Sequence, residues 1–232
     1  MEKIKNKVLI LGGTSGIGLE TAKRFSNESD VFVVGRNEEK GKEVSSLENV
    51  NFIQADISTR EGREELLKIL EKEKITKIIH CAGIFSQNKT PEYEREYKNV
   101  KSGGVEIMEI LGQKDEATHA LAISSLYTFL PDDDSHSLEK RVHEDLERAV
   151  FRINERNEKL IVNCIAPGLV DTKLARYGFG ERFHQILKDS PGSRILKPEE
   201  IAEVIYWLVN QNIINKSIIP IDGGYLRNMK NI

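Results

Sequence analysis

Cysteines and long apolar stretches are scarce in this chain. Only two of its 232 residues are cysteines, Cys81 and Cys164, and both lie in apolar segments typical of strands. This placement favours buried, reduced thiols, as in a reducing cytosol, over a disulfide framework. No apolar stretch approaches the ~20 residues that span a bilayer. No signal-peptide core precedes the first apolar run. We therefore expect a soluble, cytoplasmic protein that does not enter a membrane.

Basic clusters and metal-ligand spacings are missing as well. The formal net charge is -3 and no run of lysines and arginines stands out, which argues against nucleic acid as a partner. The five histidines do not fall into ligand spacing with acids or cysteines, so we expect no metal site. With 39% hydrophobic residues the chain can bury one sizeable core, and its length favours a single domain over residues 1–232.

Short apolar runs rich in valine and isoleucine alternate with helical patterns along the chain. Nearly continuous hydrophobicity is typical of strands that are covered on both faces. Strands that alternate with helices predict right-handed crossovers and a parallel sheet, and so an α/β fold. The predicted strands are Val8–Leu11, Val31–Val34, Asn51–Ala55, Lys77–Cys81, Ala120–Ser124, Leu160–Ile165 and Ser217–Ile221, and the predicted helices cover about 16–27, 37–47, 59–73, 92–112, 137–156, 172–188 and 198–211.

A glycine-rich turn follows the first predicted strand. Gly12, Gly16 and Gly18 have the spacing G-x-x-x-G-x-G, one variant of the dinucleotide-binding turn. Strand, glycine turn and helix present backbone N–H groups and the positive end of a helix dipole to a phosphate. The alternative is a tight strand-to-helix connection without a ligand. The second apolar run at Val31–Val34 favours the dinucleotide interpretation, because it suits a neighbouring parallel strand.

Residues that follow the other strands predict which dinucleotide is bound. An acidic residue after the second strand would bind a ribose 2′-hydroxyl, but the chain has Arg36 there, whose guanidinium can pair with a 2′-phosphate. We therefore expect NADP(H) to be preferred, with NAD(H) as the second candidate. The alternative for Arg36 is a surface arginine that opens a helix. Asp56 after the third strand is placed to meet the adenine amino group, and Ala82 and Gly83 after the fourth leave room for a ribose.

The motifs quoted so far, together with several others, resemble the short-chain dehydrogenase/reductase family. The resemblance runs along nearly the whole chain and rests on residues 12–18, 55–57, 82–83, 123–125, 162–168, 171–172, 198–202 and 221–224. It implies a Rossmann-like, doubly wound parallel sheet of about seven strands with helices on both faces, and a nicotinamide cofactor. The cofactor-binding residues that it implies are Gly12, Thr14, Ser15, Gly16, Ile17, Gly18, Asp56, Ile57, Ala82, Gly83, Pro167, Gly168 and Thr172.

The catalytic residues depart from the family's pattern. Members usually reduce a carbonyl or oxidise an alcohol with Ser, Tyr and Lys and a supporting Asn. Ser125 is in the expected place, but the Tyr-x-x-x-Lys pair that should follow on the next helix is absent. The nearest register puts His136 in the place of the tyrosine and keeps Lys140. A shift of one residue would put Ser137 and Arg141 there instead.

Three side chains, His136 among them, are candidates for the roles of the family residues that are absent here. His136 is suited to act as a general acid because its ordinary pKa lies near neutrality, and the alternative is a solvated histidine. Tyr127 is a candidate substitute phenol, or else an ordinary packing residue. Lys101 stands where the family has its supporting Asn, and is a candidate relocated cation.

The helix predicted from Leu138 to Ile153 has one apolar stripe and one charged side. We expect Glu139, Arg141, Glu144, Asp145, Glu147, Arg148 and Arg152 to face away from the sheet. In relatives this helix usually also packs against a second subunit. A face this charged gives a poor apolar interface, so we expect the usual four-helix dimer seam to be weakened or absent.

Three functions are consistent with these residues. The first is an NADP(H)-dependent oxidoreductase for a small carbonyl or alcohol substrate, with a non-standard catalytic constellation. The second is a catalytically degenerate nucleotide-binding or regulatory protein without redox turnover. The third is a different reaction in the same pocket, such as a dehydration or isomerisation.

Overall fold

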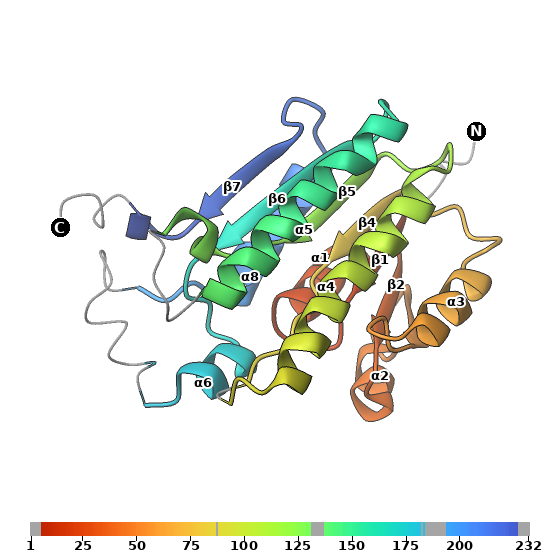
Figure 1. Ribbon diagram of the computed structural model, residues 1–232. Coiled ribbons are helices and arrows are strands. Elements are labelled where there is room, and N and C mark those ends of the chain that lie inside the picture. The colour runs from red at the N-terminus through yellow and green to blue at the C-terminus, as the bar shows by residue number, and fades with distance from the viewer. Residues whose placement is uncertain (1–5, 87, 131–136, 182, 184–193, 227–232) are drawn as a thin grey trace.

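The computed structural model describes residues 6–86, 88–130, 137–181, 183 and 194–226. Strands and helices alternate along these ranges (Figure 1). The strands are β1 (Lys7–Leu11), β2 (Asp30–Gly35), β3 (Val50–Gln54), β4 (Lys77–His80), β5 (His119–Ile123), β6 (Ile161–Pro167) and β7 (Ser217–Ile221). The helices are α1 (Gly16–Ser26), α2 (Glu38–Val44), α3 (Arg60–Ile69), α4 (Pro91–Gly112), the 3-10 helix η1 (Leu126–Phe129), α5 (Ser137–Arg156), α6 (Lys173–Phe179) and α8 (Pro198–Leu208).

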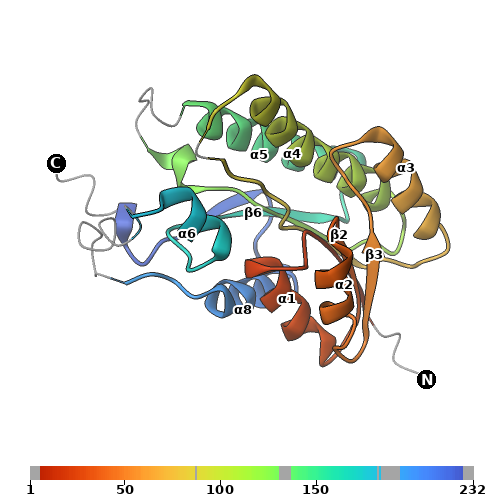
Figure 2. The same cartoon turned by 90° about the horizontal axis from the view of Figure 1, so that it is seen from below.

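The seven strands form one parallel sheet in the order β3-β2-β1-β4-β5-β6-β7. Helices cover both faces: Figure 2 shows α3, α4 and α5 on one side of the sheet and α1, α2 and α8 on the other. The predicted α/β class and the Rossmann-like, doubly wound sheet are confirmed. Strand order reverses between β1 and β4, which are neighbours in the sheet but not in the sequence. Such a reversal opens a crevice at the carboxyl ends of the strands, where ligands of this fold class bind.

The alternation of side chains along β1 builds both halves of the core. Leu9 and Leu11 belong to the apolar cluster under α3, α4 and α5, whereas Val8 and Ile10 belong to the cluster under α1 and α8. All four side chains are fully buried. Because successive residues of a strand point to opposite faces, a strand between two helical layers must be apolar at every position. This requirement explains the continuous apolar run that made the strand predictable.

Every predicted strand and most helix boundaries agree with the structure to within a few residues. The main difference lies in the helix predicted over 172–188. Helix α6 ends at Phe179, because Gly180 takes φ 51° and ψ -131° and closes the last turn. Of the residues predicted to continue this helix, 182 and 184–188 lie outside the described ranges. Among the described residues, no helix combines the length and apolarity needed to cross a membrane.

Candidate functional site

Three glycines set the geometry of the turn after β1. Gly12 and Gly16 have φ angles of 82° and 54°, a region that glycine enters without steric penalty. A Cβ on Gly12 would lie 2.6 Å from the Cα of Ala82, and one on Gly18 would lie 2.2 Å from the carbonyl oxygen of Gly12. Both contacts involve backbone, which cannot move aside. The glycines therefore hold the start of α1 tightly against the carboxyl ends of β1 and β4.

The N-terminus of α1 opens into this crevice. Ser15 is the N-cap residue, its side chain makes no capping hydrogen bond, and the first turn contains no acidic residue. The first N–H groups of a helix lack intrahelical partners and carry the positive end of the dipole. Thr172 lies directly above the turn, since a Cβ on Gly16 would be 3.2 Å from its Cγ2. A phosphate group fits this cradle in size and charge.

Arg36 follows β2 at one end of the crevice. Its Nη1 donates to Oε1 of Glu96 on α4 at 2.6 Å and lies 3.7 Å from Oδ2 of Asp56. The hydrogen bond to Glu96 raises the pKa of Arg36 further above its ordinary value, so the guanidinium remains charged. Its side chain is half exposed. Lys40 also lines the crevice here, which sequence reasoning missed because it lies inside a helix and not directly after a strand.

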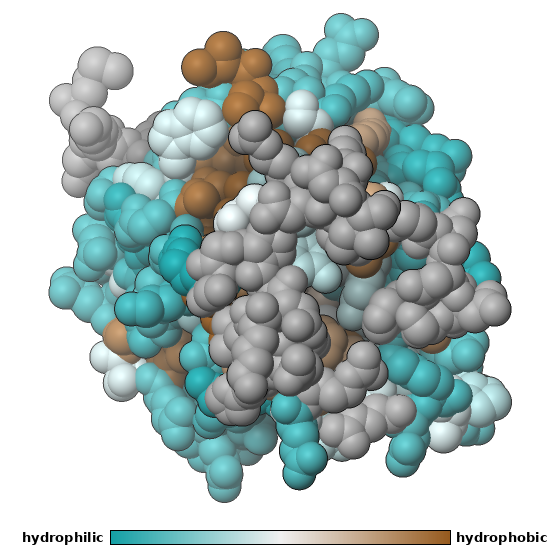
Figure 3. Space-filling view, turned by 90° about the vertical axis from the view of Figure 1, so that its left-hand side faces the viewer, coloured by the Kyte–Doolittle hydropathy of each residue, from teal (hydrophilic) through white to brown (hydrophobic). Residues whose placement is uncertain are grey.

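One cavity of about 1250 Å³ extends from this region across the carboxyl ends of the strands. Figure 3 views this side of the molecule: hydrophilic residues form much of the coloured rim, and apolar residues gather between them. Ligand pockets for small molecules span roughly 300–1,000 Å³, so the volume suits a dinucleotide together with a small substrate. Most predicted site residues line it, namely Gly12, Thr14, Ser15, Gly16, Ile17, Gly18, Arg36, Asp56, Ile57, Ala82, Gly83, Ser125, Pro167, Gly168 and Thr172.

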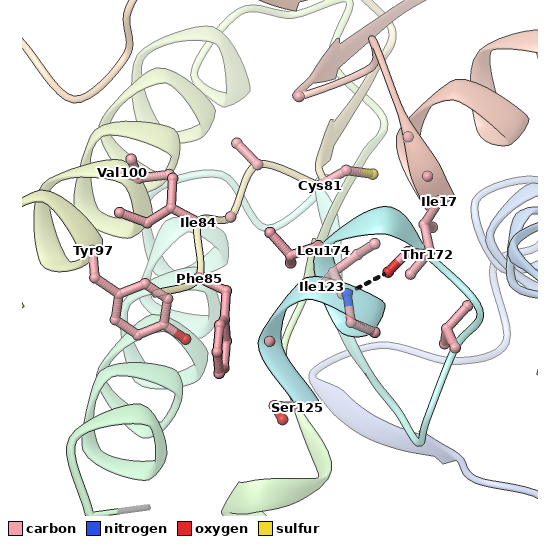
Figure 4. Close-up of a pocket in the computed structure, with 18 of the residues that line it drawn as sticks. Ile17, Cys81, Ile84, Phe85, Tyr97, Val100, Ile123, Ser125, Thr172 and Leu174 are labelled. Atoms are coloured by element: carbon pink, nitrogen blue, oxygen red, sulfur yellow. Dashed lines mark hydrogen bonds between the residues drawn. The ribbon is translucent and has the colours of Figure 1, made fainter. Parts of the chain in front are cut away.

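The predicted catalytic residues are distributed differently. Ser125 precedes η1 at the end of β5, lines the cavity, and accepts a hydrogen bond from the backbone N–H of Tyr127 at 3.4 Å (Figure 4). Lys140 lies outside the cavity lining, and its Nζ donates to the carbonyl oxygen of Leu130 at 2.7 Å. His136 falls outside the described residues. Tyr127 lines the cavity.

Helix α5 presents a charged side to the interior, contrary to expectation. Glu139 and Glu147 are only 4% and 5% exposed, so their predicted place on the solvent side is wrong. Glu139 is paired with Lys89 from the segment before α4, and Glu147 accepts a hydrogen bond from the hydroxyl of Ser124. Burial raises the pKa of Glu147, an effect that the Ser124 hydrogen bond opposes. These partners lie far away in the sequence, so helical periodicity did not indicate them.

His143 lies between these two glutamates, one turn from each, and lines the cavity. It is 6% exposed, and its Nε2 lies 2.8 Å from the hydroxyl of Tyr97 on α4. Burial first, then the charge of Lys101, lowers its pKa well below 6.5, so the ring is neutral at pH 7. Sequence reasoning missed both His143 and Tyr97. The available signal was the position of each residue within its own helix. That position becomes informative only when α4 and α5 are known to face each other.

Lys101 enters the cavity from α4. Its Nζ donates to the carbonyl oxygens of Ala82 at 3.1 Å and of Ile123 at 3.4 Å, at the ends of β4 and β5. Burial lowers its pKa to about 8. Nearby, Cys81 also lines the cavity, and burial raises the pKa of its thiol to about 12, so it is an unreactive thiol. Cys81 and Cys164 are both free, as predicted.

Helix α6 covers part of the cavity. Thr172 caps it by accepting a hydrogen bond from the N–H of Ala175 at 3.1 Å (Figure 4). Phe179 packs against Phe85, with ring centroids 6.3 Å apart, and a Cβ on Gly178 would lie 2.7 Å from that same ring. Gly178 therefore lets α6 approach the segment after β4. Phe85, Gly178 and Phe179 all line the cavity, so this contact forms part of its wall.

The fold and the cavity define a Rossmann-like α/β protein with a binding site at its topological switch point. Two family models match the chain: one described as short chain dehydrogenase over residues 6–103, and one described as enoyl-(acyl carrier protein) reductase over residues 148–226. Together they cover most of the chain. The chain belongs to the short-chain dehydrogenase/reductase family, a family of oxidoreductases.

Individual relatives match over nearly their full lengths. A 3-oxoacyl-[acyl-carrier-protein] reductase of Chlamydia pneumoniae is 28% identical, with 95% of this chain and 97% of that protein covered. An NADP-dependent (R)-specific alcohol dehydrogenase of Lentilactobacillus kefiri is 26% identical, with 97% and 98% covered. Among solved structures, ElxO with NADP bound has a TM-score of 0.82 and 25% identity, with 97% of this chain and 100% of that chain covered.

Proposed function

We propose that this protein is an NADP(H)-dependent oxidoreductase that interconverts a small carbonyl compound and its alcohol. The observation that carries the proposal is the single cavity, which joins a glycine turn and Arg36 at one end to Ser125 at the other. Two relatives support the cofactor, since the alcohol dehydrogenase is named as NADP-dependent and the ElxO structure holds NADP.

The residues of the chain fit this cofactor. The start of α1 and the positive-φ turn at Gly16 would hold the pyrophosphate. Arg36 would meet the 2′-phosphate, and Asp56 lies beside it for the adenine. Ala82 and Gly83 would admit the ribose, and Thr172 lies above the turn. When bound, a reduced nicotinamide supplies two electrons and a hydrogen to the carbonyl carbon of the substrate.

The remaining chemistry belongs to the chain itself. A carbonyl oxygen gains negative charge as the carbon is reduced, so a donor placed beside that oxygen stabilises the transition state. The hydroxyl of Ser125 fills this role at the end of β5. A proton must also reach the oxygen from a nearby acid. Phe85 and Phe179, which pack against each other, line the cavity as apolar side chains.

Binding of NADPH and NADH, measured side by side by calorimetry, tests the cofactor. We expect NADPH to bind at least about tenfold tighter, equivalent to about 1.4 kcal/mol, because of the 2′-phosphate contact. Arg36→Ala should remove this preference. Arg60→Ala is the matched control, since Arg60 lies on α3, is paired with Glu64 at 2.6 Å and does not line the cavity. Tighter binding of NADH by the wild type would contradict the role of Arg36.

Turnover of a panel of small ketones and aldehydes with NADPH tests the reaction. We expect Ser125→Ala to lower kcat by about 10²-fold, as loss of one donor to a developing oxyanion does. Binding of NADPH should remain unchanged in that variant. NADPH binding without turnover of any panel member would contradict the proposed reaction.

The second candidate is a nucleotide-binding protein without redox turnover. One observation favours it: Lys140, the lysine that the family resemblance places in the active site, does not line the cavity, and its Nζ donates to the carbonyl oxygen of Leu130. The same panel separates the two candidates, because this alternative predicts NADPH binding with no carbonyl reduction.

A further inference from the structure

Helix α4 places a phenol and an ammonium on one face, one turn apart. Tyr97 and Lys101 have the i, i+4 spacing that aligns side chains on a helix. Tyr97 is 5% exposed and Lys101 6%, and both line the cavity that Ser125 also lines. The order Tyr-x-x-x-Lys is the one that the family resemblance implies for α5, where it is absent. In Figure 4, Tyr97 projects from α4 toward Phe85, at the substrate end of the cavity.

A histidine on the facing helix holds the hydroxyl of Tyr97. Nε2 of His143 lies 2.8 Å from this hydroxyl, and the two rings meet edge-on at 75°. In the part of the chain that the structure describes, Nδ1 of His143 has no hydrogen-bond partner. With the proton on Nε2, the neutral imidazole donates to the phenol oxygen and leaves the phenol proton free to point into the cavity. His143 then also stabilises the phenolate that forms when this proton departs.

Lys101 contributes positive charge on the same face. Two carbonyl oxygens, those of Ala82 and Ile123, accept its hydrogen bonds, and a Cβ on Gly83 would lie 3.6 Å from its Nζ. This position is at the ends of β4 and β5, next to Ser125. An ammonium within a buried cavity acts over several ångströms, because low dielectric weakens screening. It therefore favours negative charge on a substrate oxygen or on a phenolate.

We propose that Tyr97 is the proton donor of this enzyme, with His143 as the residue that positions its hydroxyl and Lys101, one turn along α4, as a source of positive charge in the same cavity. This assignment rests on the proposed function. As the carbonyl carbon is reduced, the C=O π bond breaks, its electron pair moves onto oxygen, and the O–H bond of Tyr97 breaks as that oxygen takes the proton. The phenolate, held by Nε2–H of His143, regains a proton from solvent. The net change is carbonyl, reduced nicotinamide and one proton to alcohol and oxidised nicotinamide.

The surroundings of Tyr97 keep its phenol in the protonated form. Burial first, and then the nearby Tyr93 and Glu139, raise its pKa well above 10. The phenol therefore keeps its proton across the neutral range, as an acid that protonates an alkoxide must.

The tautomer of His143 tests the arrangement without any turnover. We expect the long-range ¹H–¹⁵N NMR spectrum at pH 7 to show the Nε2–H form, with the signal assigned from its loss in His143→Gln. An Nδ1–H tautomer would overturn the assignment. In that case Nε2 accepts the phenol proton, which then points at the imidazole and not into the cavity.

Kinetics of tyrosine variants provide the second test, with ethyl acetoacetate, acetophenone and benzaldehyde as carbonyl probes. We expect Tyr97→Phe to lower kcat by about 10²–10⁴-fold, the usual contribution of a general acid. The dissociation constant of NADPH for this variant, measured by NADPH fluorescence, should stay within about twofold of the wild-type value. A tenfold change would correspond to about 1.4 kcal/mol. Tyr206→Phe is the matched control, because Tyr206 lies on α8, bonds to Glu28 and does not line the cavity.

Variants of His143 separate positioning from packing. We expect His143→Gln to retain much of the rate, since the glutamine amide can donate to the phenol oxygen. We expect His143→Leu to lose most of the rate, because leucine has no donor. The outcomes are distinguishable. Turnover that survives Tyr97→Phe, or is lost in Tyr127→Phe instead, would overturn the assignment and leave the proposed function standing. NADPH binding without wild-type turnover of any probe would overturn both.

Discussion

Replacement of Lys101 by methionine should make the protein more stable at neutral pH while it impairs the site. The ammonium of Lys101 is buried beneath α4, and in the described part of the chain it has no ion-pair partner. Its Nζ donates to two backbone carbonyl oxygens. Burial lowers its pKa from the ordinary value of 10.5 to about 8, which means that the folded state disfavours the charged form. Methionine has a similar length and no charge.

The size of the effect follows from this shift. Below pH 8 the lysine is protonated in both states, and the lowered pKa costs the folded state roughly 3 kcal/mol at about 1.36 kcal/mol per pH unit. Between the two pKa values the unfolded chain binds more protons than the folded one, so stability rises with pH. Methionine removes this cost but leaves two carbonyls without a donor, at about 1 kcal/mol each. We therefore expect a net stabilisation of about 1 kcal/mol at pH 7.

Urea unfolding of the wild type and Lys101→Met, measured at pH 7, 8, 9 and 10, checks this reasoning. The stability of the wild type should rise relative to the variant by about 2–3 kcal/mol across this range, so that their order reverses. Lys98→Met is the control for a lysine-to-methionine change on the same helix, because Lys98 is exposed and does not line the cavity. A difference between wild type and Lys101→Met that stays flat from pH 7 to pH 10 would refute the argument.

Three further predictions concern other parts of the molecule. Gly104→Ala should destabilise the fold by about 1–3 kcal/mol in urea unfolding, because its Cβ would lie 2.3 Å from Nε2 of the fully buried His80; an unchanged midpoint would show that the ring can move aside. Glu96→Gln should tighten NADPH binding roughly two- to fivefold in calorimetry, because Glu96 forms an exposed ion pair that occupies Arg36. Such a pair is worth up to about 1 kcal/mol. An equal gain in NADH binding would contradict this explanation. Light scattering should show no stable dimer built along α5, whose exposed residues include Arg141, Asp145, Arg148 and Arg152; a large dimer buried along this helix would refute the expected weakening of the four-helix seam.

The arrangement of the residues around the glycine turn could be predicted because each of their features is local in the sequence. A glycine with φ 82° directly after an apolar run, followed by the start of a helix, is a turn whose geometry depends on its own residues. The residues after successive parallel strands meet at one edge of the sheet, whichever helices join them. Hence Arg36, Asp56 and Ala82 line one cavity with the glycine turn, although they come from different strands.

The surroundings of Tyr97 and His143 depend on which faces of α4 and α5 meet. The charged residues Glu139 and Glu147 lie on the inner side of α5 because Lys89 and Ser124, distant in the sequence, supply their partners. Burial of a polar group costs little once it is paired, so a helix can turn a charged side inward when another segment supplies the partner. Periodicity within one helix contains no information about that segment.

The sequence by itself therefore determined the alternation of strands and helices, the parallel sheet and the glycine turn after the first strand. Backbone conformation and strand burial are decided by neighbours along the chain. Only the tertiary structure decided that Tyr97 meets His143, that Lys101 reaches the ends of β4 and β5, and that Lys140 donates to Leu130 without lining the cavity itself. These contacts join residues far apart in the chain, and they exist only because the sheet places α4 and α5 side by side.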